Sequence, residues 1–331
     1  MRPPPVTPAP VRGGSPVQAS TQPGTPNPGR PNPDAPNPAG PQTGGQHPAG
    51  PRPKAWDGTV SMPLGGRLAK PRQAGLTMVI DKGLSLAETQ ALLDVAAEYI
   101  DFIKLAFGTT VFFTPEDLKA KVRLVQSYGV EIYPGGTLLE IAMLQDRLEA
   151  FVRRAQEIGF RCLEVSDGTV SISPRYRERL VRELVRMGFR VFTEVGKKHP
   201  ADRLPQIRLR EQILEDLEAG AEKVTVEGRE SGKGVVIYRD DGSIDEDELE
   251  LMVQAVPDPS VLIWEAPLKT QQQDLILRFG PNVNLGNVHP GDVLSLEALR
   301  VGLRGDTLRS VLLSRPELAV VRPSWPPERS P

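Results

Sequence analysis

The chain has 331 residues, and 19 of its 34 prolines fall within residues 1–72 together with 11 glycines. Trp56 is the only aromatic residue of that stretch, which therefore buries too little apolar surface to offset the entropy of ordering. Residues 1–72 carry eight basic residues against two acidic ones, so the remainder, with 32 basic against 40 acidic residues, has a formal charge of −8. An acidic folded body argues against a nucleic-acid partner and leaves room for a local basic pocket that binds a small anion.

The start of the chain is predicted to be a disordered Pro/Gly-rich tail over residues 1–72. An Asn-Pro repeat between Thr25 and Pro38 is typical of extended polyproline conformations, and a solvated extension is favoured over a docking segment. A single cysteine, Cys162, excludes an intrachain disulfide framework. The N-terminus lacks the apolar core of a signal peptide, and no apolar run approaches the roughly 20 residues that span a bilayer. We expect a cytoplasmic protein without a membrane segment.

Short β-rich runs alternate with helical stretches from Gly75 onward, which is typical of parallel βα units. The predicted strands are Leu76–Asp81, Asp101–Leu105, Val130–Tyr133, Cys162–Val165, Val191–Glu194, Lys223–Glu227, Val261–Glu265 and Val283–Leu285. Helix starts are indicated by a Ser85/Glu88 capping box and by the pairs Thr114-Pro115 and Ser173-Pro174.

Eight strand–helix repeats over roughly 240 residues predict a (β/α)8 TIM barrel, with a doubly wound open sheet as the competing α/β fold. The barrel is expected over residues 73–312, followed by an irregular C-terminal tail over residues 313–331. Each predicted strand has a polar residue near its carboxyl end, flanked by apolar residues of the opposite parity. These polar residues are Asp81, Lys104, Tyr133, Glu164, Glu194, Glu227, Glu265 and Asn284. Polar ends on all eight strands favour a closed barrel, because only a barrel brings them to one axial opening. Cys162 lies deeper in its strand and is interpreted as a small core residue.

Several carboxylates are expected to point into this opening, where they repel one another unless a cation lies between them. Glu164, Glu194 and Glu227 are therefore candidate metal ligands, and oxygen donors without His or Cys favour Mg²⁺ over zinc. A structural ion network, in which these acids pair with Lys104, Lys197 and Arg229, remains the alternative.

Basic side chains at the same strand ends exceed what the acids need once a metal is bound, and they indicate anionic substrates. Glycine turns there can offer backbone N–H groups to a phosphate. The candidate anion-binding residues are Lys82, Lys104, Gly135, Gly136, Ser166, Arg229, Lys269, Asn287 and Arg304. Ordinary strand-to-helix turns, helix caps and solvated lysines are the alternatives for these glycines and cations.

The strand ends resemble those of the phosphosulfolactate synthase family. The matching motifs, in order and at the family spacing from about residue 75 to 310, are Gly75-Leu-Thr-Met-Val-Ile-Asp-Lys-Gly83, Tyr133-Pro-Gly-Gly-Thr137, Glu164-Val-Ser-Asp-Gly168, Thr193-Glu-Val-Gly-Lys-Lys198, Glu227-Gly-Arg-Glu-Ser-Gly-Lys-Gly234, Glu265-Ala-Pro267 and Gly302-Leu-Arg-Gly-Asp-Thr307. One departure is at Ala106 and Phe107, where the family often has glycine and tryptophan.

The resemblance implies a Mg²⁺-dependent enzyme, expected to be a homo-oligomer, that adds sulfite to phosphoenolpyruvate and gives (2R)-phospho-3-sulfolactate. On this hypothesis Glu164, Glu194 and Glu227 bind the metal, and Lys198 protonates C2, with Lys197 as the second candidate acid. Lys104, Arg229 and the glycine turns then bind the anionic groups. The competing interpretation is a non-catalytic anion-binding or stress-related barrel of the same family. The pathway that consumes the product, towards coenzyme M or sulfolactate, stays open.

Overall fold

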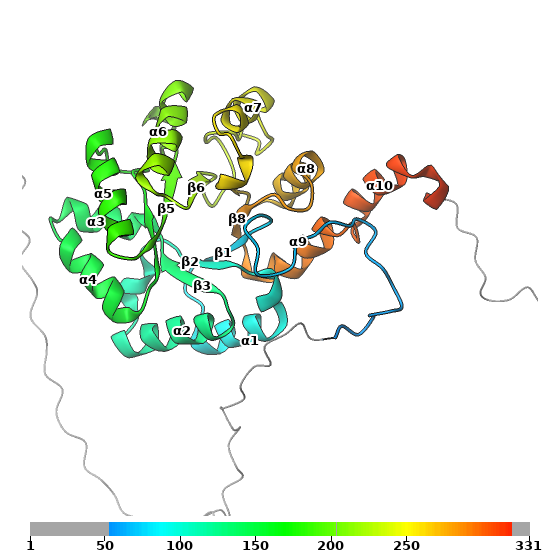
Figure 1. The fold of residues 1–331 in the computed structure, drawn as a ribbon, viewed down its shortest axis with the longest axis horizontal. Helices are drawn as coiled ribbons and strands as arrows, with labels where there is room; N and C mark the ends of the chain where they lie inside the picture. The colour runs from blue at the N-terminus through cyan, green and yellow to red at the C-terminus, as the bar shows by residue number, and fades with distance from the viewer. Residues whose placement is uncertain (1–52, 203, 320–331) are drawn as a thin grey trace, which may run out of the picture. The chain divides into compact units, whose positions relative to one another are not determined.

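The computed structural model describes residues 53–202 and 204–319 of the chain. In these ranges eight parallel strands form one sheet with the order β3-β2-β1-β8-β7-β6-β5-β4. The strands are β1 (Thr77–Asp81), β2 (Phe102–Leu105), β3 (Glu131–Pro134), β4 (Cys162–Val165), β5 (Arg190–Val195), β6 (Lys223–Val226), β7 (Leu262–Glu265) and β8 (Leu285–Val288). Helices surround the strands (Figure 1). The predicted (β/α)8 barrel is confirmed.

The helices follow the strands around the outside of the barrel. They are α1 (Leu86–Ala96), α2 (Pro115–Ser127), α3 (Gly136–Leu144), α4 (Leu148–Ile158), α5 (Pro174–Arg186), α6 (Gln206–Ala219), α7 (Glu246–Gln254), α8 (Lys269–Phe279), α9 (Val293–Arg300) and α10 (Gly305–Ser314). The predicted N-caps are confirmed: Ser85 forms a capping box with Glu88, and Thr114 and Ser173 each accept a hydrogen bond from the first turn of their helix. No helix in the described ranges is long and apolar enough to cross a membrane.

The two ends of the strand order, β3 and β4, meet at a seam that side chains bridge. The backbone N–H of Gly136, just after β3, donates to Oε1 of Glu164 on β4 at 2.8 Å. Ser166, just after β4, donates to Glu140 of α3. The barrel is therefore nearly closed, and polar groups at the carboxyl ends of the strands link β3 to β4.

The inside of the barrel has its own apolar core below the polar strand ends. It consists of Leu76, Met78, Phe102, Tyr133, Cys162, Phe192 and Ile263. The rings of Phe102 and Phe192 meet edge to face with centroids 4.9 Å apart. A larger apolar cluster lies between the strands and the helices. The buried position of Cys162 confirms its interpretation as a core residue.

Asp81 does not face the axial opening, which corrects its predicted parity. Leu76 and Met78 point into the barrel, so Asp81 points outward, where its carboxylate lies 2.6 Å from the ammonium of Lys121 on α2. The Asp81 carboxylate also accepts the N–H groups of Gly83 and Leu84, which turns the chain towards α1.

Asn284 is the second correction, because the last strand lies further along the chain than predicted. The strand is Leu285–Val288 rather than Val283–Leu285. The Asn284 side chain therefore lies at the amino end of the barrel, where it accepts from the N–H of Leu76 and donates to the carbonyl of Leu262. It is Asn287, three residues later, that reaches the site end.

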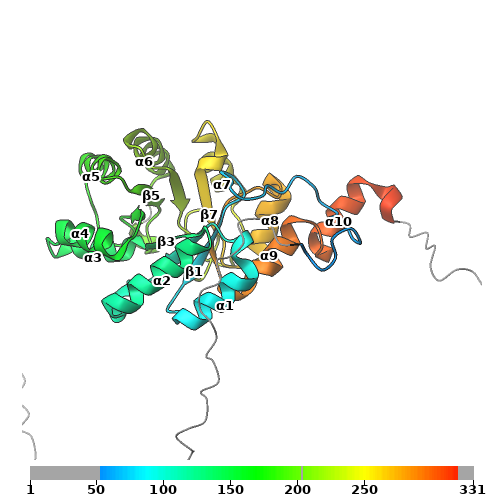
Figure 2. The same ribbon diagram turned by 60° about the horizontal axis from the view of Figure 1, so that its bottom comes forward.

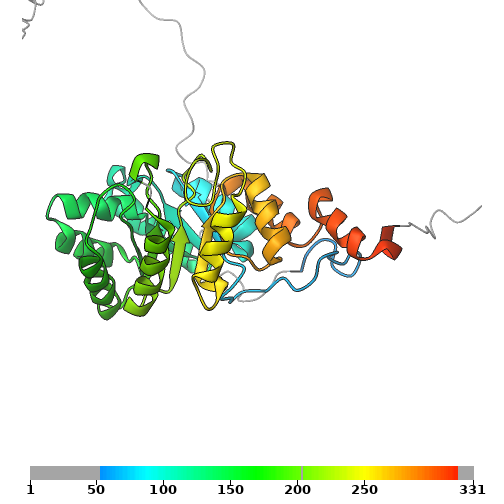
Figure 3. The ribbon, with the colours of Figure 1, turned by 90° about the horizontal axis from the view of Figure 1, so that it is seen from above.

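Part of the predicted tail packs against the barrel. Arg67 pairs with Glu297 of α9 at 2.9 Å, and Arg72 pairs with Asp101 at 2.8 Å. The N–H of Leu64 donates to the carbonyl of Val301 at 2.9 Å. Figures 2 and 3 show this segment, in blue, running beside α9 and α10. The rest of the predicted tails, residues 1–52 and 320–331, lies outside the described residues.

Candidate functional site

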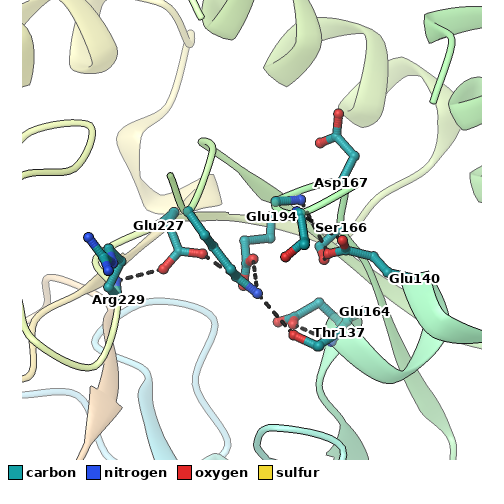
Figure 4. A network of polar contacts seen from close by, with 12 residues as sticks. Thr137, Glu140, Glu164, Ser166, Asp167, Glu194, Glu227 and Arg229 are labelled. Atoms are coloured by element: carbon teal, nitrogen blue, oxygen red, sulfur yellow. Dashed lines mark hydrogen bonds and ion pairs between the residues drawn. The ribbon is translucent and has the colours of Figure 1, made fainter. Parts of the chain in front are cut away.

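A cavity of about 400 Å³ opens at the carboxyl ends of the strands, and we call it the mouth. All eight strands or the loops that follow them contribute to its wall. It is lined by Ile80, Lys104, Ala106, Phe107, Gly135, Gly136, Thr137, Glu164, Thr169, Glu194, Lys198, Glu227, Arg229, Glu230, Glu265 and Asn287. Figure 4 shows Glu164, Glu194 and Glu227 gathered between Thr137 on one side and Arg229 on the other.

Lys104, at the end of β2, lies at the centre of the carboxylates. Its ammonium nitrogen is 3.0 Å from Glu164, 2.8 Å from Glu194 and 3.0 Å from Glu265. All four side chains are buried. Burial acts to lower the pKa of Lys104, but the three carboxylates outweigh it and raise the pKa well above its usual value. Lys104 is therefore a fixed positive charge that keeps three strands' acids together.

A second group of acids shares two members with the first. Carboxylate oxygens of Glu194, Glu227 and Glu265 lie within 4.8 Å of one another, and all three residues are buried. Within the described ranges, Oε1 of Glu194 and Oε2 of Glu227 have no hydrogen-bond donor, and neither does Oε2 of Glu164 beside them. Buried acceptors without a donor cost free energy unless a cation or water completes them.

The charges of the mouth point to the same need for a cation as the oxygens without a donor. Four buried carboxylates, those of Glu164, Glu194, Glu227 and Glu265, face two ammonium groups, those of Lys104 and Lys198. If all four carboxylates are ionised, the excess of two negative charges equals the charge of one divalent cation. Because the donors are all oxygens, the set fits a hard cation such as Mg²⁺ and does not resemble a zinc site.

The acids of the mouth respond to this crowding in opposite directions. Burial raises the pKa of Glu164 to about 7, despite the opposing effect of Lys104. Burial, together with the negative charges of Glu194 and Glu265, raises the pKa of Glu227 well above its usual value. Burial acts in the same direction on Glu194, but Lys104 and Lys198 outweigh it and hold the pKa of Glu194 well below its usual range. Such divergence within one cavity is typical of functional sites.

Lys198, in the loop after β5, is the cation that reaches across the mouth. Its ammonium nitrogen lies 3.6 Å from Glu194 and 4.0 Å from Glu227, and it donates to the hydroxyl of Thr137 at 3.0 Å. The charge of Glu194 is the main reason that the pKa of Lys198 is raised above its usual value. Lys198 therefore carries its proton at neutral pH.

Backbone strain also concentrates at the mouth. Phe107, Arg229 and Asn287 adopt φ values of 56°, 58° and 53°, which side-chain-bearing residues rarely take. Gly228, beside Arg229, approaches the carbonyl of Glu265 so closely that a Cβ would lie 2.3 Å from that oxygen. Strain of this kind persists where the surrounding contacts enforce it, which is common at ligand-binding sites.

Comparison with known proteins identifies a family. Residues 65–306 match the family model of (2R)-phospho-3-sulfolactate synthase (ComA). A phosphosulfolactate synthase of Methanothermobacter thermautotrophicus is 46% identical over 250 residues, which cover 75% of this chain and 96% of the relative. Those of Methanocaldococcus jannaschii and Bacillus subtilis are 41% and 36% identical, covering 72% and 75% of this chain and 96% and 97% of the relatives.

The chain belongs to the (2R)-phospho-3-sulfolactate synthase family. It is accordingly an enzyme of the phosphosulfolactate synthase type, in the lyase class, that acts on small substrates.

Most of the residues predicted for the site of this synthase line the mouth together. They are Lys104, Gly135, Gly136, Glu164, Glu194, Lys198, Glu227, Arg229 and Asn287. They come from six different strands or the segments that directly follow them, so only closure of the barrel brings them together.

Five predicted residues of the synthase do not line the mouth. Lys82 pairs with Glu230 at the rim, at 2.5 Å. Lys269 and Arg304 both contact Asp306 of α10, at 2.6 and 3.7 Å. The Ser166 hydroxyl donates to Glu140.

Lys197 is the fifth of these, and it points away from the mouth. Its ammonium donates to the Asp167 carboxylate and the Val170 carbonyl, both at 2.9 Å. Its position therefore gives no support to a role as the proton donor, because its ammonium is already bonded to Asp167 and Val170 outside the mouth.

Three polar lining residues of the synthase site are not among the predicted site residues: Thr137, Thr169 and Glu230. Glu265 was recognised as a polar strand end but was not assigned to the metal. The signal for Glu265 was present, since its parity and its position at the end of β7 are the same as those of Glu194 on β5.

Proposed function

We propose that the mouth catalyses the addition of sulfite to phosphoenolpyruvate, giving (2R)-phospho-3-sulfolactate, with Mg²⁺ as cofactor. The observation that supports this most is the buried group of Glu194, Glu227 and Glu265, with Lys104 and Lys198 against it. Acids that hold a cation, next to ammonium groups, are what a reaction between two anions requires.

Glu194, Glu227 and Glu265 are the residues that would hold the metal. Glu194 and Glu227 each offer a buried oxygen that accepts no hydrogen bond from the described residues. Glu265 lies within reach of both, although its oxygens already accept from Lys104 and the N–H of Gly228. Bound there, Mg²⁺ would supply Lewis-acid stabilisation of negative charge on substrate oxygens. Glu164, which the sequence also assigned to the metal, is linked to the same group through Lys104.

The chemistry consists of one bond formation and one protonation. The sulfur lone pair of sulfite forms a bond to the methylene carbon of phosphoenolpyruvate, and the π electrons of the double bond move onto C2 and the carboxylate. A proton then adds to C2, and no group leaves. Preorganised positive charge is the largest contribution that a protein makes to such a step.

Lys198 is the group placed to deliver that proton. Its ammonium lies inside the mouth, held between Thr137 and Glu194, and it is protonated at neutral pH. Delivery from one fixed side chain would give a single configuration at C2, as the (2R) product requires. The Lys198 amine then regains a proton from solvent.

Arg229 and the glycine turn at Gly135 and Gly136 are the parts of the wall that suit the phosphate and the carboxylate of the substrate. Arg229 lies on the opposite side of the mouth from Thr137 (Figure 4). The ammonium of Lys104 already faces three carboxylates, so its part is to hold them rather than to meet an anion directly.

The test is incubation of the full chain with Mg²⁺, phosphoenolpyruvate and sulfite, with mass spectrometry of the products. Phosphosulfolactate that forms only when all three are present supports the proposal. A protein that binds phosphoenolpyruvate but yields no sulfonated product would instead support the non-catalytic barrel.

A further inference from the structure

The loop from Ser166 to Val170, which follows β4, is fixed from one side by Lys197. The Lys197 ammonium donates to the backbone carbonyl and the carboxylate of Asp167 and to the carbonyl of Val170. Asp167 is in turn 3.1 Å from the guanidinium of Arg177, which also donates to the carbonyl of Glu194 at 3.0 Å. These contacts tie the loop after β4 to the end of β5.

Glu140 of α3 fixes the same loop from the other side. Its carboxylate is 1% exposed and accepts from the Ser166 hydroxyl and from the N–H groups of Gly168, Thr169 and Val170, the last two at 2.9 Å. Figure 4 shows Glu140 directed at Ser166 and away from the acids around Glu194. A buried acid with four donors determines the path of the backbone that supplies them.

The loop held in this way forms the wall against which Lys198 lies. The N–H of Lys198 donates to the carbonyl of Gly168 at 3.0 Å. A Cβ at Gly168 would lie 3.0 Å from Cε, 3.2 Å from Cγ and 3.3 Å from Cδ of Lys198. The Lys198 stem therefore runs along the bare backbone of Gly168 before its ammonium reaches Thr137.

We propose that Glu140 and Lys197 are positioning residues, which hold Gly168 against the stem of Lys198 and so aim the Lys198 ammonium into the mouth. The inference rests on the proposed function, in which Lys198 delivers the proton. Neither Glu140 nor Lys197 lines the mouth, so both act through the loop and not on the substrate.

Gly168→Ala directly tests the contact between the loop and the Lys198 stem. The backbone of Gly168 is outside the left-handed region, and the three atoms nearest to the added methyl all belong to Lys198. We expect kcat to fall about 10-fold with KM for phosphoenolpyruvate within about twofold, because the Lys198 stem must move by a few tenths of an ångström and misplacement of a reacting group slows the step. Gly305→Ala is the matched control, since a Cβ there meets open space.

Glu140→Gln tests whether Glu140 holds the loop in place, because the amide places a donor where two backbone N–H groups need an acceptor. We expect a similar loss of kcat at unchanged KM. In the double variant with Gly168→Ala, the loss should be no greater than that of the worse single variant, because both act on one side chain. Multiplied losses, or a raised KM with unchanged kcat, would overturn the inference.

Reductive methylation with formaldehyde and dimethylamine-borane gives a readout that does not depend on turnover. Peptide mass spectrometry reports the rate at Lys198 relative to that at Lys119 of α2 in the same protein. We expect this ratio to change severalfold in Gly168→Ala and Glu140→Gln and to stay unchanged in Gly305→Ala. An unchanged ratio in the first two variants overturns the inference. A wild-type protein that makes no product overturns the proposed function instead.

Discussion

The ammonium nitrogen of Lys104 lies 2.8 Å from Oε2 of Glu194, and this pair joins β2 to β5 across the barrel. The same nitrogen contacts Glu164 of β4 and Glu265 of β7. One buried cation thus holds together the acids of three strands that are far apart in the sequence. Without it, three carboxylates would share a desolvated space with no positive charge between them.

Lys104→Met should therefore destabilise the fold by about 3–5 kcal/mol, because it leaves buried carboxylates without their partner. Urea unfolding followed by circular dichroism measures the change, with Lys119→Met of α2 as the matched control. The loss should be smaller at pH 5 than at pH 8, since the remaining carboxylates can then bind protons. An equal loss at both pH values would show that packing of the lysine stem, and not its charge, is what matters.

Substitution of single carboxylates should show whether Glu265 or Glu164 binds the metal. Glu265→Gln and Glu227→Gln should each weaken Mg²⁺ binding at least about tenfold, because each removes a charged oxygen from the group around Glu194. Glu164→Gln should have the smaller effect, since Glu164 is not in the group of acids whose oxygens lie within 4.8 Å of one another. Isothermal titration calorimetry with MgCl2 at fixed pH measures the Mg²⁺ affinity of each variant. A larger loss in Glu164→Gln than in Glu265→Gln would assign Glu164 to the metal site instead.

Lys198→Met should lower kcat about 10²- to 10⁴-fold, the usual contribution of a positioned acid, and leave the fold intact. The side chain is partly exposed, at 33%, and its loss opens no core cavity. Turnover of phosphoenolpyruvate and sulfite gives kcat, and Lys119→Met again serves as the control. Full activity of Lys198→Met would remove this lysine from the reaction.

The sequence predicts the barrel well because alternation of apolar strands and capped helices is a local pattern. Which side a polar strand residue faces is not local. Glu194 and Asp81 both end apolar strands, yet Glu194 points into the mouth and Asp81 points to α2, where Lys121 compensates its charge. The partner lies 40 residues away, and nothing in the strand itself reports it. The roles of Ser166 and Lys197 are hidden for the same reason, since Glu140 and Asp167 become their partners only in the folded chain.

The Asp81 and Lys121 pair is fully buried, so breaking it should have a large effect on stability. Asp81→Asn should lower the free energy of unfolding by about 3–5 kcal/mol, because it leaves the Lys121 ammonium buried without its counter-charge. The double variant Asp81→Leu with Lys121→Met should recover part of that loss, because it removes both charges. Urea unfolding of the wild-type protein and both variants measures these changes. A double variant less stable than Asp81→Asn would contradict the ion-pair argument.

The thiol of Cys162 gives a pH dependence of the opposite kind. Burial raises its pKa to about 12, so the folded state keeps the proton above pH 9, where the unfolded chain loses it. The unfolded state then binds fewer protons than the folded state, and stability falls as pH rises from about 9 towards 12, by at most about 1.4 kcal/mol per pH unit from this group. Cys162→Ala should remove that part of the slope in urea titrations between pH 8 and 10.5.

At pH 8 the native thiol of Cys162 should also resist iodoacetamide, because its thiolate fraction is roughly a thousandfold below that of an exposed cysteine. Rapid stoichiometric labelling of the folded protein, together with an unchanged slope in Cys162→Ala, would mean that this side chain is not sealed inside the barrel.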